Sequence, residues 1–121
     1  MAGPARAGRH RARRGGLSVD LYEEGDSATV TGPQAVAAHR LVQESLTNTI
    51  KHANATHVSV RLRYTSAAVT VEVIDDGHGA TAPAEGHGLT GMRERVTTLG
   101  GTLGIEGSGG FAVRASIPLG T

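Results

Sequence analysis

Residues able to do chemistry gather in three short tracts of this chain. Residues 44–52 read ESLTNTIKH, residues 75–79 read DDGHG, and residues 86–96 read GHGLTGMRERV. The first tract carries hard oxygen ligands, the second a carboxylate beside glycines, and the third a glycine-rich approach to a helix. Glycines before a helix start let the backbone approach a polyphosphate. Each tract is weak evidence alone, but the order and spacing of the three tracts together predict a purine nucleotide site.

The first tract lies on a helix predicted for residues 34–52. Glu44, Asn48, Lys51 and His52 recur at helical spacing and share one stripe. Such a stripe is typical of a ligand site and also of the solvated face of an amphipathic helix, and spacing alone favours the solvated face. The opposite side is predicted to be buried and consists of Ala35, Ala38, Val42, Leu46, Thr49, Ile50 and Ala53.

The second tract follows a strand, where glycine permits a sharp turn. Asp75 ends that strand, and an unpaired carboxylate buried there would select strongly for a matching donor. A plain glycine-rich turn is the alternative. Asp76 is expected to point the other way, as a turn residue.

The third tract precedes a helix predicted over residues 90–99, with Gly100 and Gly101 as its C-terminal stop. Unpaired amides and the positive dipole end make a helix start suitable for anions. Arg93 and Arg95 are candidates to reach a phosphate, although such residues are more often solvated or paired with a neighbour such as Glu94.

Together the tracts resemble the N, G1 and G2 boxes of the GHKL superfamily of gyrase, heat-shock chaperone, histidine kinase and MutL ATPases. The resemblance implies that Asn48 coordinates Mg²⁺ and that Glu44 acts as a base or orients the attacking group. It implies that Asp75 accepts a hydrogen bond from the adenine amino group. The remaining ATP-binding residues that it implies are Lys51, His52, Gly77, Gly79, Gly86, His87, Gly88, Leu89 and Thr90.

The segments VQESLTN and GLTGMRERV more specifically resemble the catalytic domain of sensor histidine kinases paired with helix-turn-helix response regulators. Phe111 and Ala112 depart from the Gly-Thr of many relatives, which removes a hydroxyl near the adenine site. None of the six His is followed by an acid, as the phosphoacceptor His of such kinases is. We therefore expect a catalytic module that binds Mg·ATP, requires a separate phosphoacceptor histidine domain and a response regulator, and does not label itself.

Other functions remain open at this point. A serine kinase of the anti-sigma-factor type would share the fold and boxes, and a non-enzymatic ATP-binding decoy or sensor would share the site. A nucleic-acid-binding domain would use an arginine-rich N-terminus, but we expect contact with neither nucleic acid nor membrane. The pattern G-x-x-x-x-G-K-[ST] is absent, which excludes a P-loop.

The elements that position these tracts follow from periodicity. Alternating residues predict a strand over 17–22 with a short partner over 28–31, a hairpin over 58–64 and 69–73, and a last hairpin over 103–105 and 111–117. Hairpins interrupted by helices favour an α+β two-layer sandwich, and the resemblance implies the Bergerat or GHKL ATP-binding fold. Its mixed, mostly antiparallel sheet is covered by helices on one face, and Arg61 and Arg63 are expected on the other, solvent-exposed face.

Composition limits the number of domains and the cellular compartment that we expect for this protein. The 121 residues are 38% hydrophobic with only three aromatic residues, which fits one small aliphatic domain. Five of the twelve cations fall in residues 1–14, predicted to be a basic disordered tail, and residues 15–121 form the domain with seven cations against eleven acids. The chain has no Cys and no apolar run near the ~20 residues of a membrane span. We expect a cytoplasmic protein.

Overall fold

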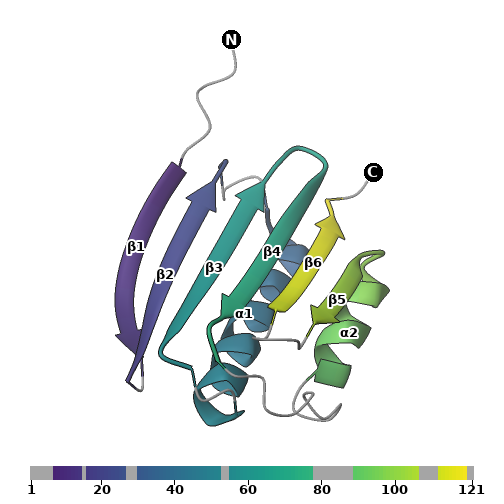
Figure 1. Cartoon of the computed structure of the whole chain (residues 1–121). Helices are drawn as coiled ribbons and strands as arrows, with labels where there is room; N and C mark the ends of the chain where they lie inside the picture. Colours follow the sequence, from purple (N-terminus) through teal and green to yellow (C-terminus); the bar gives the residue numbers. More distant parts are fainter. Residues whose placement is uncertain are drawn as a thin grey trace.

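The computed structural model describes residues 7–14, 16–26, 30–52, 55–77, 89–106 and 112–119. Within these residues the strands form a six-stranded sheet, and both helices lie on the same face of it (Figure 1). The strand order is β1-β2-β3-β4-β6-β5. The elements are β1 (Ala7–Arg14), β2 (Leu17–Glu24), α1 (Gly32–His52), β3 (His57–Tyr64), β4 (Ala68–Asp75), α2 (Leu89–Thr98), β5 (Thr102–Glu106) and β6 (Ala112–Pro118).

The pairing within this sheet is mixed and mostly antiparallel, as predicted. β3 and β4 form one antiparallel hairpin, and β5 and β6 form another. β2 and β3 run parallel because α1 connects them and returns the chain to the starting end of the sheet. Val30 and Thr31 lie in no strand, so the predicted partner over 28–31 is wrong for these two, and residues 28–29 lie outside the description.

The core lies between the sheet and its helices. Alternate strand residues face the helices, so the central strands contribute a Val-rich surface: Val58, Val60, Val69, Val71, Val73, Val113 and Ile117 are each at most 2% exposed. α1 packs Leu41 against this surface, and α2 packs Met92 and Val96, each 1% exposed. An aliphatic interior of this kind matches the scarcity of aromatic residues.

The buried side of α1 differs in part from the prediction. Ala38, Leu46 and Thr49 are buried as expected, but Ile50 is 42% exposed. Its place in the interior is taken by a stripe that the sequence pattern did not single out, Ala37, Leu41 and Ser45. The reason is that α1 contacts two neighbours, the sheet and α2, and so buries a wider arc than one apolar stripe.

Residues 7–14 were predicted to be disordered, and that prediction is wrong for them. They form β1, which pairs antiparallel with β2 over the whole strand, from Ala7 opposite Glu24 to Arg14 opposite Leu17. Backbone groups at the edge of β2 supply this pairing whatever the composition of the partner. An acid on β2 also balances the cations, because Arg11 Nε donates to Asp20 Oδ1 at 2.9 Å. Residues 1–6 and 15 lie outside the description.

Glycines end α2 as predicted. Gly100 has a φ of +80° and donates its N–H to the Thr97 carbonyl, while Gly101 donates to the Val96 carbonyl at 2.8 Å. These two bonds form a Schellman cap. Gly101 also lies against β6, where a Cβ would overlap the Ser116 carbonyl oxygen and approach Val96 Cγ1 to 2.9 Å.

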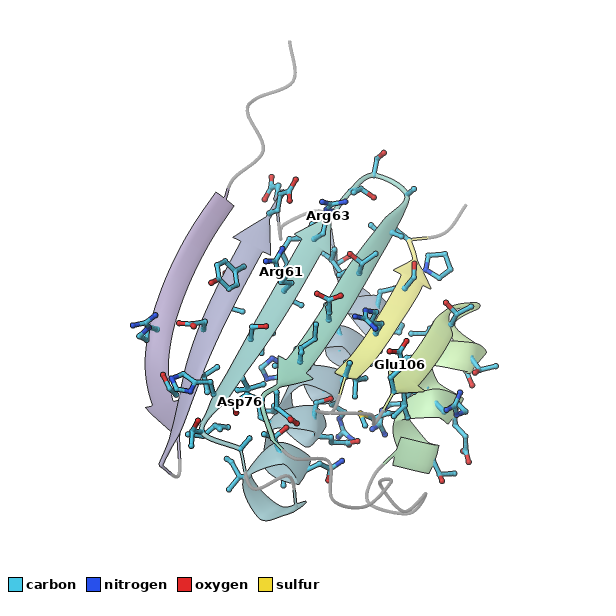
Figure 2. The ribbon with its side chains drawn as sticks, viewed as in Figure 1. Arg61, Arg63, Asp76 and Glu106 are labelled. Carbon is cyan, nitrogen blue, oxygen red and sulfur yellow. The ribbon has the colours of Figure 1, made fainter. Side chains whose placement is uncertain are left out.

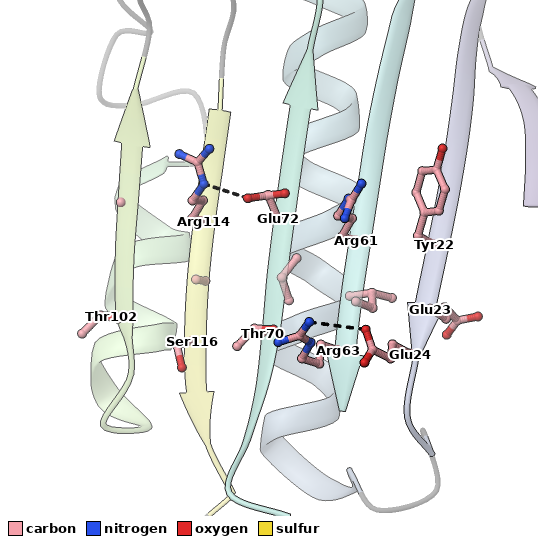
Figure 3. A pocket seen from close by; sticks show the side chains of 14 residues that line it. Tyr22, Glu23, Glu24, Arg61, Arg63, Thr70, Glu72, Thr102, Arg114 and Ser116 are labelled. Atoms are coloured by element: carbon pink, nitrogen blue, oxygen red, sulfur yellow. Dashed lines mark hydrogen bonds and ion pairs between the residues drawn. The ribbon is translucent and has the colours of Figure 1, made fainter. Parts of the chain in front are cut away.

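The sheet face opposite the helices is polar. Arg61 and Arg63 are exposed on it, as predicted (Figure 2). A broad hollow of about 820 Å³ lies over this face, and its cations are already engaged by neighbouring strands (Figure 3). The contacts are Arg63 Nη2 to Glu24 Oε1 at 3.4 Å, Arg114 Nε to Glu72 Oε2 at 2.8 Å, and the Arg61 guanidinium 5.1 Å from the Tyr22 ring centroid.

We predict that Gly101→Ala destabilises the domain by about 1–3 kcal/mol, because the new methyl group must displace the β6 backbone or Val96. Urea unfolding followed by circular dichroism measures this. Gly104→Ala is the matched control, since a Cβ on Gly104 meets nothing within 4 Å. Equal stability of the two variants would contradict the close packing of α2 against β6.

Candidate nucleotide site

Three parts of the fold that are distant in sequence meet at one end of the sheet. The C-terminal half of α1, the end of β4 and the start of α2 lie together at the lower end in Figure 1. They carry the first tract, the beginning of the second and the helical part of the third. The two-layer arrangement therefore brings together the parts of the three tracts that the structure describes.

Asp75 occupies a buried position at the end of β4. It continues the alternation of Val69, Val71 and Val73, so its side chain faces the helices and is 5% exposed. The Thr49 hydroxyl donates to Oδ2 at 3.3 Å, and the Gly77 N–H donates to Oδ1 at 2.8 Å. A carboxylate is thus held in a fixed orientation under the C-terminal half of α1.

Asp76 points the other way, as predicted, but it is much more than a turn residue. Its Oδ1 accepts the backbone N–H groups of Thr56 and His57, both at 2.9 Å, and its Oδ2 accepts the Thr56 hydroxyl at 2.8 Å. These hydrogen bonds, the one from the His57 amide foremost, hold the pKa of Asp76 well below its usual range. Asp76 therefore fastens the end of β4 to the start of β3.

An ion pair joins α1 to α2 beside the site. Arg95 Nη2 donates to Glu44 Oε1 at 2.6 Å, and the two side chains are 33% and 31% exposed. The Arg95 guanidinium lies over Gly91, one turn earlier, where a Cβ would make an ordinary van der Waals contact 3.7 Å from Nη1. Arg93 instead donates to the Leu103 carbonyl at 3.0 Å. The predicted alternatives for these arginines, solvent or Glu94, thus give way to contacts within the fold.

Two polar atoms of the first tract are buried and lack a hydrogen-bond partner among the described residues. They are Glu44 Oε2 and Asn48 Nδ2. Because an unsatisfied buried polar atom costs about 1–3 kcal/mol, such a pair one helical turn apart indicates a place for a ligand. Glu44 and Asn48 are partly buried, which favours the ligand-site interpretation of these two residues over a fully solvated face.

These two residues also suit a divalent metal. A carboxylate and an amide oxygen are hard ligands of the kind that Mg²⁺ prefers, and the amide of Asn48 can turn either atom inward. The donor set thus fits the metal that the sequence resemblance implies.

The other predicted site residues are described only in part. Thr90 lies exposed in the first turn of α2, where the sequence placed a helix start. Lys51, His52 and Leu89 belong to helices, but their side chains lie outside the description, as do the whole residues Gly79, Gly86, His87 and Gly88.

Comparison with known proteins identifies the family of this chain. Residues 34–121 match the model of the histidine kinase-, DNA gyrase B- and HSP90-like ATPases. The chain is 40% identical over 95 residues to the signal transduction histidine-protein kinase/phosphatase UhpB of Salmonella typhimurium, covering 77% of this chain and 19% of UhpB. It is 40% identical over 111 residues to the kinase/phosphatase DegS of Brevibacillus brevis, covering 88% and 29%.

Solved structures agree with this match. The blue-light activated histidine kinase EL346 of Erythrobacter litoralis superposes with a TM-score of 0.69 at 29% identity, covering 88% of this chain and 36% of that one. Fold and site therefore define a GHKL-type ATPase domain. The chain belongs to the histidine kinase-, DNA gyrase B- and HSP90-like ATPase family, and it is the ATP-binding catalytic domain of a sensor histidine kinase.

The chain spans less than a third of the length of these two curated relatives. Among the described residues, neither helix is both long and apolar enough to cross a bilayer.

We predict that Glu44 and Arg95 are energetically coupled. In a double-mutant cycle of Glu44→Gln and Arg95→Met, the coupling in the free energy of unfolding should be about 0.5–1 kcal/mol, because the pair is only partly shielded from water. Combining Glu44→Gln with Arg93→Met provides the control, which we expect to be additive. A Glu44–Arg95 cycle that is also additive would show that the contact contributes nothing.

Proposed function

We propose that this domain binds Mg·ATP between the C-terminal half of α1 and the end of β4, and donates the γ-phosphate to a histidine on a separate dimerisation and phosphoacceptor domain. The observation that carries this proposal is the buried carboxylate of Asp75, held at both oxygens by Thr49 and Gly77. A buried charge is costly unless it is hydrogen-bonded or paired, and these contacts hold the Asp75 carboxylate in one orientation at the end of β4.

In this proposal Asp75 recognises the base. Its carboxylate accepts a hydrogen bond from the exocyclic amino group of adenine, whereas guanine presents a carbonyl oxygen at the same position. Two acceptors that face each other cannot form a hydrogen bond and repel, so the contact selects adenine. Gly77 supports this role, because the chain leaves β4 with no side chain at that position to crowd the purine ring.

Glu44 and Asn48 serve the phosphate end of the nucleotide. Asn48 would hold Mg²⁺ through its amide oxygen, and the bound metal would neutralise charge on the phosphates. Arg95 holds one oxygen of Glu44, which leaves Oε2 to orient the attacking group. We assign the remaining contacts with ATP to Lys51, His52, Gly79, Gly86, His87, Gly88, Leu89 and Thr90.

The partners follow from the chemistry of transfer. Phosphoryl transfer asks a protein chiefly to position the reactants and neutralise charge, and the nucleophile comes from the acceptor. Since the relatives UhpB and DegS are named as histidine kinase/phosphatases, we propose a phosphoacceptor histidine domain and a helix-turn-helix response regulator as partners, acting in the cytoplasm.

Calorimetric titration with ATP, with and without Mg²⁺, tests the binding site. Asp75→Asn should weaken ATP binding by about 1–3 kcal/mol, since one polar partner of the base is lost. Glu106→Gln makes the same chemical change on the open sheet face, at a side chain 74% exposed, and should leave the affinity unchanged. Failure of the unaltered chain to bind ATP would refute the proposal, and an unchanged affinity in Asp75→Asn would remove Asp75 from its role.

Incubation with γ-labelled Mg·ATP tests the transfer. The chain alone should stay unlabelled, while a supplied dimerisation and phosphoacceptor domain should gain label that is lost in acid and kept in alkali, as for phosphohistidine. Acid-stable label would instead identify a serine kinase. Rapid labelling of the chain by itself would contradict the need for a separate acceptor.

A further inference from the structure

Two adjacent carboxylates at the end of β4 have different surroundings. Asp75 faces the helices and is 5% exposed, whereas the Asp76 side chain is 47% exposed and lies at the start of β3 (Figure 2). Nothing in the proposed chemistry uses Asp76. Its two oxygens nevertheless accept hydrogen bonds from both backbone and side-chain donors, so the fold holds this exposed side chain in a defined place.

Among the described residues, the contacts of Asp76 lead to Thr56 and to His57, the first residue of β3. Oδ1 accepts two backbone amides, those of Thr56 and His57 at 2.9 Å each. Oδ2 accepts the Thr56 hydroxyl at 2.8 Å and lies 3.2 Å from His57 Nδ1. The backbone of Asp76 joins the same cluster, because its N–H donates to the His57 carbonyl at 3.1 Å. Both the side chain and the main chain of residue 76 are therefore fixed to β3.

This fixed residue separates Asp75 from the amide that orients it. The Gly77 N–H reaches back across residue 76 to Asp75 Oδ1 at 2.8 Å, which requires the chain to turn at Asp76. A turn held by a cluster of hydrogen bonds keeps this bond in place before any ligand arrives. Release of Asp76 from β3 would let the turn relax and the Asp75 carboxylate rotate.

We propose that Asp76 is a positioning residue for adenine recognition: it holds the turn that orients Asp75, and so sets the preference for ATP over GTP without contacting the base. This inference rests on the proposed role of Asp75. Asp76, the second residue of the DDG sequence, then affects nucleotide specificity indirectly, by orienting its neighbour Asp75.

Substitutions at position 76 can distinguish the hydrogen-bond geometry of this side chain from its charge. Asparagine at position 76 keeps an Oδ1 that can accept both amides, and its Nδ2 can donate to the Thr56 hydroxyl oxygen. Alanine removes every side-chain contact of the cluster. If Asp76 acts by holding the turn, Asp76→Asn should behave like the unaltered protein and Asp76→Ala should not.

The other end of the same hairpin offers a matched control. Thr65 Oγ1 accepts the amides of Ala67 and Ala68 at 3.2 and 3.0 Å and donates to the Ala68 carbonyl at 3.0 Å. Thr65→Ala therefore removes a comparable cluster between side chain and backbone at the β3–β4 turn, at the opposite end of β4 from Asp75. It should reproduce a loss of stability without any change in base selectivity.

The experiment is titration of each variant with Mg·ATP and with Mg·GTP, after denaturation curves have shown that it is folded. In Asp76→Ala we expect the ratio of the GTP to the ATP dissociation constant to fall by about five-fold or more. In Asp76→Asn and Thr65→Ala the ratio should stay within about two-fold of that of the unaltered protein. Should Asp76→Ala fail to fold, Thr56→Val removes the hydroxyl bond but keeps both amide bonds, and should give a smaller fall.

An unchanged ratio in Asp76→Ala, or in Thr56→Val where it replaces Asp76→Ala, would overturn the inference. If Asp75→Asn lowers the ratio in the same experiment, the proposed function survives that result. If the unaltered protein binds ATP and GTP equally, the adenine contact of Asp75 itself is wrong and the inference falls with it. An equal fall in Thr65→Ala would reduce the effect of Asp76 to stability and would also overturn it.

Discussion

A carboxylate placed in the interior of a small domain is the constraint from which the site follows. Removing its charge from water is costly, so the surrounding fold must supply donors to Asp75. The strand supplies the position, α1 supplies the Thr49 hydroxyl, and the turn after β4 supplies the Gly77 amide. Each of these elements is therefore tied to the others through one side chain, and together they fix its orientation.

The site can form because both helices cover the same face of the sheet. Because α1 lies against both the sheet and α2, it places one polar edge between them, with Glu44 joined to Arg95 and Ser45 Oγ donating to Met92 Sδ at 3.9 Å. The buried Glu44 Oε2 and Asn48 Nδ2 lie on this edge. The opposite sheet face instead balances its own charges across neighbouring strands, which fits a solvated surface.

Local patterns in the sequence predicted most of the architecture, since alternating Val residues define β3 and β4, and Gly100 and Gly101 mark the end of α2. β1 escaped prediction because edge pairing uses the backbone, which a run of arginines does not reveal. In the site, the resemblance to the N and G1 boxes indicated Glu44, Asn48 and Asp75, whereas spacing alone favoured a solvated face for the first two. Contacts between residues distant in the sequence, such as Asp76 with Thr56 or Arg95 with Glu44, produce no periodic pattern. They could be found only from the three-dimensional structure.

The parallel pairing of β2 with β3 has a consequence for how the molecule assembles. Hairpins close through neighbouring residues and form on the scale of ~1–10 µs, whereas β2 meets β3 only after the intervening segment that contains α1 has closed as a loop. We expect this non-local closure to come late. A partly unfolded chain would then lack the β2–β3 pairing while the β3–β4 hairpin still persists.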